Sequence, residues 1–328
     1  MPLRAGVDQR GQPSGQGRAL LYAARVNQLE GKRILVTGPA GQVARPVVTA
    51  LAARNDVVGV ARFGDPSVRA ELEAIGVTCV PVDLARDGFD AVPDDVDLVL
   101  NFAVVKSGRW DVDLRGNAEA AGLLMAHCHR AGAFLHCSST GVYQPAGAHR
   151  LRESDPLGDN HRPMMETYSI SKIAAEAVVR TEARQLGLPT TIARLNVPYG
   201  DNGGWPAFHL ECVLAGIPVP VHPDRPNLFN PIHEDDIIAT LPALVDAANV
   251  PATIVNWGGD EQVALEDWVA ELGRLVGREP ELVETPDTIG GVTTDNTLRL
   301  ELAGPTTVDW RDGLHRMVTT LHPEALVQ

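Results

Sequence analysis

The chain has 328 residues, of which 44% are hydrophobic and 21% are charged, as is usual for a soluble globular protein. Its formal net charge of −14 excludes the basic footprint that nucleic acid or an anionic membrane surface requires, so we expect neither as a partner. The cysteines are far apart, without a CxxC pair or zinc-site spacing, so we expect buried thiols, no metal and a cytoplasmic location. They are Cys79, Cys128, Cys137 and Cys212.

Residues 1–28 are predicted to form a flexible leader. The stretch up to Gly17 is rich in Gly, Gln, Arg and Pro, and it lacks the apolar run of a signal peptide. Residues 18–28 have the pattern of a short amphipathic helix. Nothing later in the chain reaches the length of a transmembrane span, so we expect no membrane-embedded part.

A glycine-rich turn follows the first predicted strand. The apolar run 33–37 leads into this turn, and a helical pattern then continues to Leu51. This order suits a dinucleotide pyrophosphate, because glycines allow close approach of the backbone and the helix N-terminus offers free N–H groups. We therefore predict that the turn binds a dinucleotide through Gly38, Ala40, Gly41, Gln42 and Val43.

The end of the second predicted strand bears on the choice of cofactor. The strand covers residues 56–60 and Arg62 follows it, so the acid that commonly holds the ribose 2′-hydroxyl of NAD is missing. An arginine here can bind a 2′-phosphate, which favours NADP over NAD, although a strand-end arginine can also be simply solvated. A third strand, residues 77–82, ends at Asp83 and Leu84, which we expect to contact the adenine ring.

Strands and helices continue to alternate along the chain. This alternation indicates an α/β fold with a doubly wound parallel sheet of the Rossmann type. The further strands are predicted at residues 97–103, 133–137, 189–195 and 252–258, with helices at 117–131, 265–276 and 310–321. Ligands of such sheets bind beyond the carboxyl ends of the strands. Five residues at predicted strand ends should therefore line one crevice: Gly38, Arg62, Asp83, Lys106 and Ser139.

Tyr168 and Lys172 are four residues apart at the start of a predicted helix. Positions i and i+4 lie on one helix face, so both side chains can reach one pocket. A fixed cation beside a tyrosine favours the tyrosinate and lowers its pKa towards neutral pH, where proton exchange is efficient. The pair is also compatible with a solvated helix face, so the hypothesis of proton transfer depends on the other motifs.

With these pieces in place the chain resembles an extended short-chain dehydrogenase/reductase of the NAD-dependent epimerase/dehydratase family. The resemblance extends from about residue 32 to the C-terminal helix. Each match is modest, but the matches occur in the family's order. They are Thr37-Gly38-x-x-Gly41-x-x-Ala44, Asp83-Leu84, Ser139-x-x-Val142-Tyr143, Tyr168-x-x-x-Lys172, Arg194-Leu195-Asn196-Val197 and Pro231-Ile232-His233-Glu234-Asp235-Asp236.

The resemblance implies a catalytic triad of Ser139, Tyr168 and Lys172. Tyr168 would exchange a proton with the substrate oxygen, Ser139 would hold that oxygen, and Lys172 would bind the nicotinamide ribose. Lys106 matches a lysine near the nicotinamide and substrate of UDP-galactose 4-epimerase, although a solvated loop lysine is an equal alternative. Further expected cofactor contacts are Phe102, Ala103, Val104, Asn196 and Val197.

Two departures from the family limit the substrate prediction. Sugar 4,6-dehydratases carry Asp-Glu directly after the catalytic hydroxyl residue, and Thr140-Gly141 stands there, which argues against that dehydration. Nucleotide-sugar epimerases usually carry an arginine that pairs with the pyrophosphate where this chain has Phe229, although Arg225 lies nearby. We therefore expect a substrate pocket that is more apolar than that of a nucleotide-sugar epimerase. The alternative is that its aromatic residues only pack in the hydrophobic core. The predicted substrate contacts are Lys106, Thr140, Met165, Trp205 and Phe229.

We expect a dinucleotide-binding domain at residues 29–197, to which residues 229–260 return. Residues 198–228, predicted as loop-rich, and 261–328 would form a substrate-binding cap. The leading hypothesis is an NAD(P)-dependent oxidoreductase that moves hydride between the nicotinamide and a ketone or secondary alcohol of a small or medium organic molecule. The alternative is a nucleotide-sugar epimerase with tightly bound NAD. A non-catalytic NADP-sensing protein is least favoured, because the triad is complete.

The resemblance also implies a homodimer. Family members frequently pack two helices of each subunit into a four-helix bundle, and these helices correspond to residues 117–131 and 166–184. A monomer would bury much the same apolar residues against its own sheet. These residues are Leu123, Leu124, Ala175, Val178 and Val179.

Overall fold

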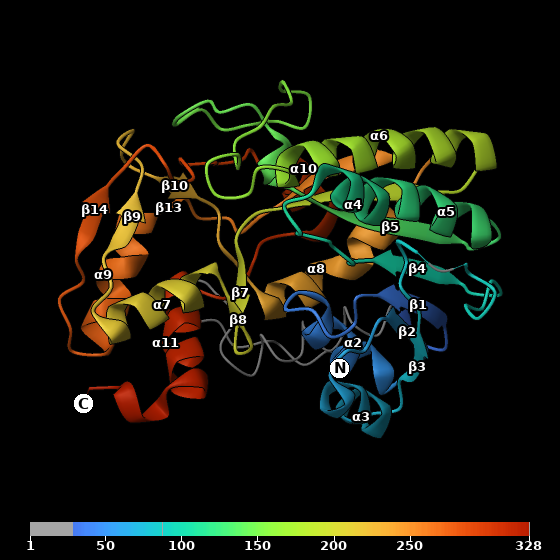
Figure 1. Ribbon diagram of the computed structural model, residues 1–328, viewed down its shortest axis with the longest axis horizontal. Helices are drawn as coiled ribbons and strands as arrows, with labels where there is room; N and C mark the ends of the chain where they lie inside the picture. Colours follow the sequence, from blue (N-terminus) through green and yellow to red (C-terminus); the bar gives the residue numbers. More distant parts are fainter. Residues whose placement is uncertain (1–28, 87, 328) are drawn as a thin grey trace, which may run out of the picture.

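The computed structural model describes residues 29–86 and 88–327, so the predicted leader lies outside the described residues. Its centre is a seven-stranded parallel sheet in the order β12-β6-β5-β4-β1-β2-β3 (Figure 1). The predicted doubly wound, Rossmann-type α/β sheet is confirmed. The strands are β1 (Arg33–Thr37), β2 (Asp56–Ala61), β3 (Thr78–Pro81), β4 (Leu98–Asn101), β5 (Ala133–Ser139), β6 (Thr190–Leu195) and β12 (Thr253–Trp257).

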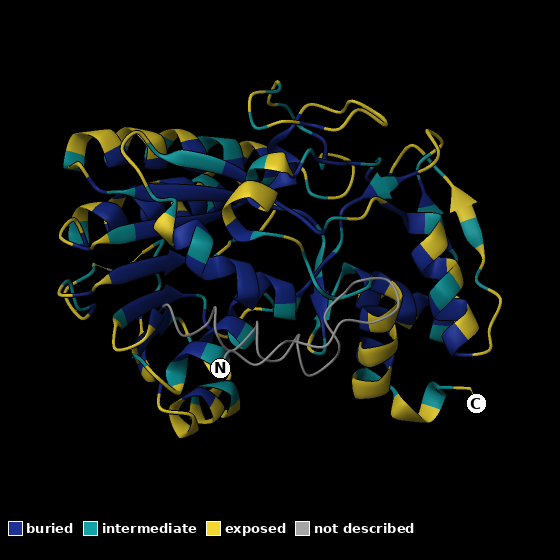
Figure 2. Cartoon of the chain, turned by 180° about the vertical axis from the view of Figure 1, so that it is seen from behind, coloured by how far each residue is buried: buried dark blue, intermediate teal, exposed yellow. Residues whose placement is uncertain are grey.

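Helices cover both faces of this sheet because its strands are apolar on both sides. In β1, Ile34 and Val36 belong to the apolar cluster that includes residues of α2 and α8, whereas Leu35 belongs to the cluster with α5 and α6. Figure 2 shows the sheet buried between the exposed outer sides of the helices. The helices are α2 (Ala44–Ala52), α3 (Pro66–Ala74) and α8 (Glu234–Asp246) on one face, and α4 (Trp110–Leu114), α5 (Ala120–His127) and α6 (Tyr168–Leu186) on the other.

The helix predicted at residues 117–131 differs from the observed one. The chain becomes helical at Trp110, passes through a π-helical turn, η2 (Arg115–Glu119), and ends α5 at His127. Asn117 lies in the wide turn, where its side chain accepts from Val105 N (2.7 Å) and donates to Val105 O (2.8 Å). The turn therefore serves to hold the loop that follows β4.

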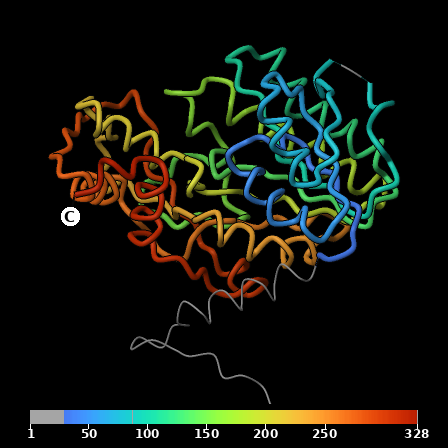
Figure 3. Tube along the Cα trace, turned by 90° about the horizontal axis from the view of Figure 1, so that it is seen from below, coloured from blue at the N-terminus to red at the C-terminus, as the bar shows by residue number. Residues whose placement is uncertain are grey.

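The cap, which we define as residues 198–228 and 261–328, lies beside the sheet along the long axis of the molecule (Figure 3). The expectation of a loop-rich segment was wrong, because 205–215 form α7, with Pro206 in the first turn and Gly216 closing it at φ +66°. The helices are α7 (Trp205–Ala215), α9 (Leu265–Leu275), α10 (Thr297–Ala303) and α11 (Trp310–Leu321). Of these, α10 packs on α8 and β12, beside the sheet.

Short strands join the cap to the sheet. In the three-stranded sheet, β7 lies between β8 and β11, and two further pairs are β9 with β14 and β10 with β13. Asp236 of α8 accepts from Thr307 N (2.7 Å) and Val308 N (3.1 Å), ahead of α11. The strands are β7 (Pro198–Gly200), β8 (Gly203–Gly204), β9 (Val219–Val221), β10 (Leu228–Phe229), β11 (Ile232–His233), β13 (Val263–Ala264) and β14 (Leu282–Glu284). The 3-10 turns are η3 (Thr140–Val142) and η4 (Pro323–Ala325).

The expectation of buried thiols is confirmed, since all four cysteines are free and buried. Within residues 29–86 and 88–327, no helix combines the length and the apolar character needed to cross a bilayer.

Candidate active site

A cavity of about 660 Å³ lies beyond the carboxyl ends of β4, β5 and β6, where the cap meets the sheet. Parallel strands end at one edge, and this edge collects residues that are far apart in the sequence. Thirteen of the predicted site residues line the cavity: Gln42, Val43, Phe102, Val104, Lys106, Ser139, Thr140, Met165, Tyr168, Lys172, Val197, Trp205 and Phe229.

Ser139, Tyr168 and Lys172 meet in this cavity. Ser139 is the last residue of β5, Tyr168 is the first residue of α6, and Lys172 lies one turn further along that helix. Ser139 shares a hydrogen bond with Tyr168, and its Oγ also accepts from Gly141 N (3.0 Å). The Lys172 ammonium donates to the Cys137 carbonyl (2.8 Å). The hydroxyls of Ser139 and Tyr168 are close enough to reach one substrate oxygen together, as proton transfer at that oxygen would require.

The pKa of Tyr168 differs from the sequence expectation. Burial raises it to about 12, and the hydrogen bond with Ser139 opposes this only in part. Burial also lowers the pKa of Lys172, whose ammonium is anchored on the Cys137 carbonyl. The expected lowering by Lys172 is therefore not found, because desolvation of the phenol dominates. Tyr168 is a protonated phenol at neutral pH, which is the form of a proton donor.

Lys106 lies over the ring of Tyr168, with Nζ 5.1 Å from the ring centroid. The loop that carries it is held by buried polar residues that sequence reasoning did not identify in this role. The carboxylate of Asp113 accepts from Ser107 N (2.9 Å) and from Thr167 Oγ1, and Thr167 directly precedes Tyr168. Asp113 thereby ties the Lys106 loop to the start of α6.

The glycine turn fits a dinucleotide phosphate. Gly38 has φ +65°, and a Cβ there would lie 3.1 Å from Ala103 Cα, so only glycine lets β1 and the residues after β4 approach this closely. No side chain caps the N-terminus of α2, and although Arg45 N donates to Gly41 O (2.9 Å), no described side chain occupies the N–H groups just ahead of it. Gln42 and Val43, just ahead of that helix, line the cavity. The turn therefore offers the anion site that a pyrophosphate needs.

Eight predicted cofactor residues do not line the cavity. Arg62 follows β2 and is exposed to solvent. Asn196 is completely buried, and its side chain donates to Val292 O (2.8 Å) and accepts from Asn230 N (3.2 Å), so it joins the cap to the sheet. The eight are Gly38, Ala40, Gly41, Arg62, Asp83, Leu84, Ala103 and Asn196.

Val197 lines the cavity in a strained backbone conformation. Its φ is +36°, which a β-branched residue adopts only when its surroundings impose it. Its carbonyl accepts from Ile232 N (3.1 Å), and this bond fixes the turn between β6 and the cap.

The far end of the cavity is aromatic. The ring of Phe229 lies 5.1 Å from Trp205 and 5.5 Å from Trp268, measured between centroids. Arg225, the nearby candidate for a pyrophosphate, does not line the cavity and instead faces Glu266 (3.7 Å) and Glu284 (3.8 Å). In the described part of the chain, the only Lys or Arg residues lining the cavity are Lys106 and Lys172.

Sequence reasoning also missed His161. This residue lies in the long segment between η3 and α6, lines the cavity, and has its ring 5.4 Å from that of Tyr168. Burial and the charge of Lys106 lower its pKa to about 4. No sequence motif marks this residue, and only the structure shows that its ring packs against Gly141, where a Cβ would lie 3.0 Å from it.

Comparisons with known proteins agree with the fold described above. The UDP-glucuronic acid 4-epimerase of Bacillus cereus, solved with UDP-glucuronic acid and NAD, has 20% identity and a TM-score of 0.77, covering 89% of this chain and 99% of that one. The dTDP-glucose 4,6-dehydratase DesIV of Streptomyces venezuelae, solved with NAD and TYD, has 22% identity and a TM-score of 0.73, covering 89% and 97%. These identities show a shared fold.

A search of curated proteins found no match. The sequence model described as NAD dependent epimerase/dehydratase family matches residues 34–222, which is more than half of the chain. From this match, we conclude that the chain belongs to the NAD-dependent epimerase/dehydratase family.

Proposed function

We propose that the protein is an NADP-dependent oxidoreductase that interconverts a ketone and a secondary alcohol on an organic substrate without a diphosphate. The observation that carries this proposal is the composition of the cavity. Ser139, Tyr168 and Lys172 meet at one end, whereas Trp205 and Phe229 line the other. Aromatic rings favour an apolar group and cannot neutralise a diphosphate.

In the direction of reduction, Tyr168 donates its hydroxyl proton to the substrate oxygen, and Ser139 donates a hydrogen bond to the same oxygen. When bound, a nicotinamide dinucleotide supplies the hydride that completes the alcohol. Lys172 would hold the ribose of that cofactor, and its positive charge would stabilise the tyrosinate left after proton transfer. The raised pKa of Tyr168 keeps the phenol protonated before each reduction. The same groups act in reverse when an alcohol is oxidised.

Arg62 supports NADP as the cofactor. It follows β2, where no acid occupies the strand end, and it is exposed and has no ion-pair partner within residues 29–86 and 88–327. A guanidinium in this position binds a 2′-phosphate through two parallel hydrogen bonds.

A nucleotide-sugar epimerase with tightly bound NAD is the second candidate. The fold likeness to the UDP-glucuronic acid 4-epimerase of Bacillus cereus, which was solved with NAD, favours it. Transient oxidation followed by reduction from the other face would use the same triad. The lack of a cavity arginine in the described part of the chain argues against it.

Titration calorimetry tests this choice, after absorbance and mass spectrometry have shown whether a cofactor co-purifies. We expect an empty site, tighter binding of NADPH than of NADH, and NADPH oxidation with a panel of acetophenone, cyclohexanone and benzylacetone. Tightly retained NAD together with binding of UDP-glucose or UDP-glucuronic acid would instead establish the epimerase. Binding of NADPH without oxidation in the presence of any ketone would contradict the proposal.

A further inference from the structure

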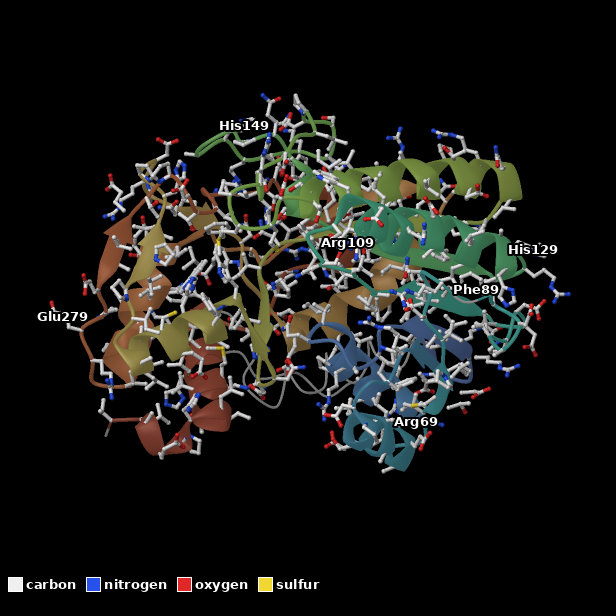
Figure 4. The ribbon with its side chains drawn as sticks, viewed as in Figure 1. Arg69, Phe89, Arg109, His129, His149 and Glu279 are labelled. Atoms are coloured by element: carbon white, nitrogen blue, oxygen red, sulfur yellow. The ribbon has the colours of Figure 1, made fainter. Side chains whose placement is uncertain are left out.

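His161 adds a polar group to the cavity that the triad does not use. Its ring enters the space beside Tyr168, where the centroids are 5.4 Å apart. The glycine at position 141 admits this ring, because a Cβ there would lie 3.0 Å from its Cε1 and Nδ1 atoms. The segment that carries His161 runs outside the sheet, and His149 of the same segment is exposed in its outer loop, where its Nε2 pairs with Asp155 (2.8 Å) (Figure 4).

Asn160 determines which nitrogen of His161 carries the proton. Its Nδ2 donates to the Thr140 carbonyl (3.1 Å), so its Oδ1 is the atom that faces His161 Nδ1. An amide oxygen only accepts, and therefore Nδ1 carries the hydrogen. The ring is neutral at neutral pH, since burial and the Lys106 charge lower its pKa to about 4. Nε2 is left as a lone-pair acceptor.

This acceptor is available to a substrate. Among the described residues, none forms a hydrogen bond with His161 Nε2. The nearby side chains Ser139, Tyr168 and Lys106 line the same cavity and each carries a hydrogen-bond donor, although one of the two hydroxyl hydrogens lies in the bond that Ser139 and Tyr168 share. A ketone oxygen satisfies donors only, so a simple ketone leaves the acceptor unused. A substrate hydroxyl would satisfy it.

We propose that His161 Nε2 accepts a hydrogen bond from a substrate hydroxyl close to the reacting carbonyl, such as one on the adjacent carbon. The neighbourhood follows from the position of the His161 ring, which lies beside the Tyr168 ring with 5.4 Å between their centroids in the same cavity. The substrate class is therefore a hydroxyketone, or the matching diol, whose apolar remainder packs against Trp205 and Phe229. This inference rests on the proposed oxidoreductase function, and it makes His161 a specificity-determining residue.

The test compares three probes with saturating NADPH: benzylacetone, its 3-hydroxy derivative and its 3-methoxy derivative. The methyl ether keeps the oxygen but cannot donate, so the ratio of kcat/KM for hydroxy over methoxy isolates the donated hydrogen bond. Two variants remove the acceptor: His161→Leu, and His161→Phe, which also fills the space beside Gly141. Because a general loss of activity cancels in the ratio, a partly damaged variant remains informative. His149→Leu makes the same change at an exposed position of the same segment.

We expect a ratio of about ten or more in the wild type and in His149→Leu, and a ratio near one in both His161 variants, as loss of one well-placed hydrogen bond predicts. A wild-type ratio near one, or a ratio that survives both substitutions, would overturn the inference and leave the oxidoreductase in place. If NADPH binds but is oxidised neither with these three probes nor with acetophenone or cyclohexanone, the proposed function fails, and the inference fails with it.

Discussion

Tyr168 is the residue on which the proposed chemistry depends most directly. Tyr168→Phe keeps the ring beside His161 but removes the proton donor, so we expect kcat to fall by about 10²- to 10⁴-fold with NADPH affinity nearly unchanged. Steady-state kinetics measures kcat, and titration calorimetry measures the affinity for NADPH. Tyr199→Phe is the control, because it removes a hydroxyl that bonds weakly to Trp310 O (3.4 Å). Full turnover by Tyr168→Phe would remove Tyr168 from its proposed role.

Arg62 and Arg45 form a matched pair for testing the cofactor preference. Arg62 is exposed beyond β2, whereas the Arg45 guanidinium is already paired with Glu71. We expect Arg62→Ala to weaken NADPH binding by about tenfold or more and to leave NADH binding almost unchanged, since only NADPH carries the 2′-phosphate. Arg45→Ala should have a smaller effect on either cofactor. Equal losses for both cofactors in Arg62→Ala would argue against a 2′-phosphate site.

At the start of α8, Glu234 introduces a pH-dependent cost into the fold. Burial, together with the charges of Asp201 and Asp235, raises its pKa from 4.5 to about 7, and its Oε2 has no hydrogen-bond partner among the described residues. Between these two pKa values the folded protein holds a proton that the unfolded chain has lost. Stability therefore falls as pH rises through this window, and the cost persists above it.

Glu234→Gln should remove this cost. We expect the variant to be more stable than the wild type by on the order of 1 kcal/mol at about pH 8, a modest gain because Glu234 stays partly open to solvent. The gain should shrink towards pH 5, where the folded wild type keeps Glu234 protonated. Urea unfolding at several pH values measures the difference. Glu301→Gln, at an exposed position of α10, should show no such trend. A pH-independent gain in Glu234→Gln would mean that the effect does not arise from titration.

For the molecule as a whole, we propose a homodimer formed through the outer faces of α5 and α6. Of the apolar residues considered for this interface, Leu124, Ala175 and Val179 are buried within the subunit, whereas Leu123 is 58% exposed. Ile170 on α6 is also exposed, so a small apolar surface remains for a partner.

Leu123→Glu should convert the dimer into a monomer, because a charge would be buried at the interface. Sedimentation velocity measures the change. Ile217→Glu is the control, since Ile217 is similarly exposed (56%) but lies on the cap. A wild type that sediments as a monomer, or a dimer unaffected by Leu123→Glu, would contradict the interface.

The positions of the sheet strands were largely predictable because strands and turns are encoded locally. The apolar run 33–37 is β1, the glycine turn follows it, and the final helix occupies residues 310–321 as expected. The observed elements differ from the predicted ones where a side chain bonds to a residue far away in the sequence. The π-helical turn at η2 exists because Asn117 bonds to Val105 and Ser171, and the second of these is 54 positions away.

By itself, the sequence determined the α/β sheet, the glycine turn and the Tyr168 and Lys172 spacing, since each depends on periodicity within a few residues. Only the tertiary structure decided that His161 enters the cavity, that Asp113 holds the Lys106 loop, and that Arg225 faces acids instead of the cavity. These contacts join separate elements, and their energies depend on burial and three-dimensional distance. The pKa of Tyr168 has the same origin, because its desolvation exists only after the sheet and the cap have closed around it.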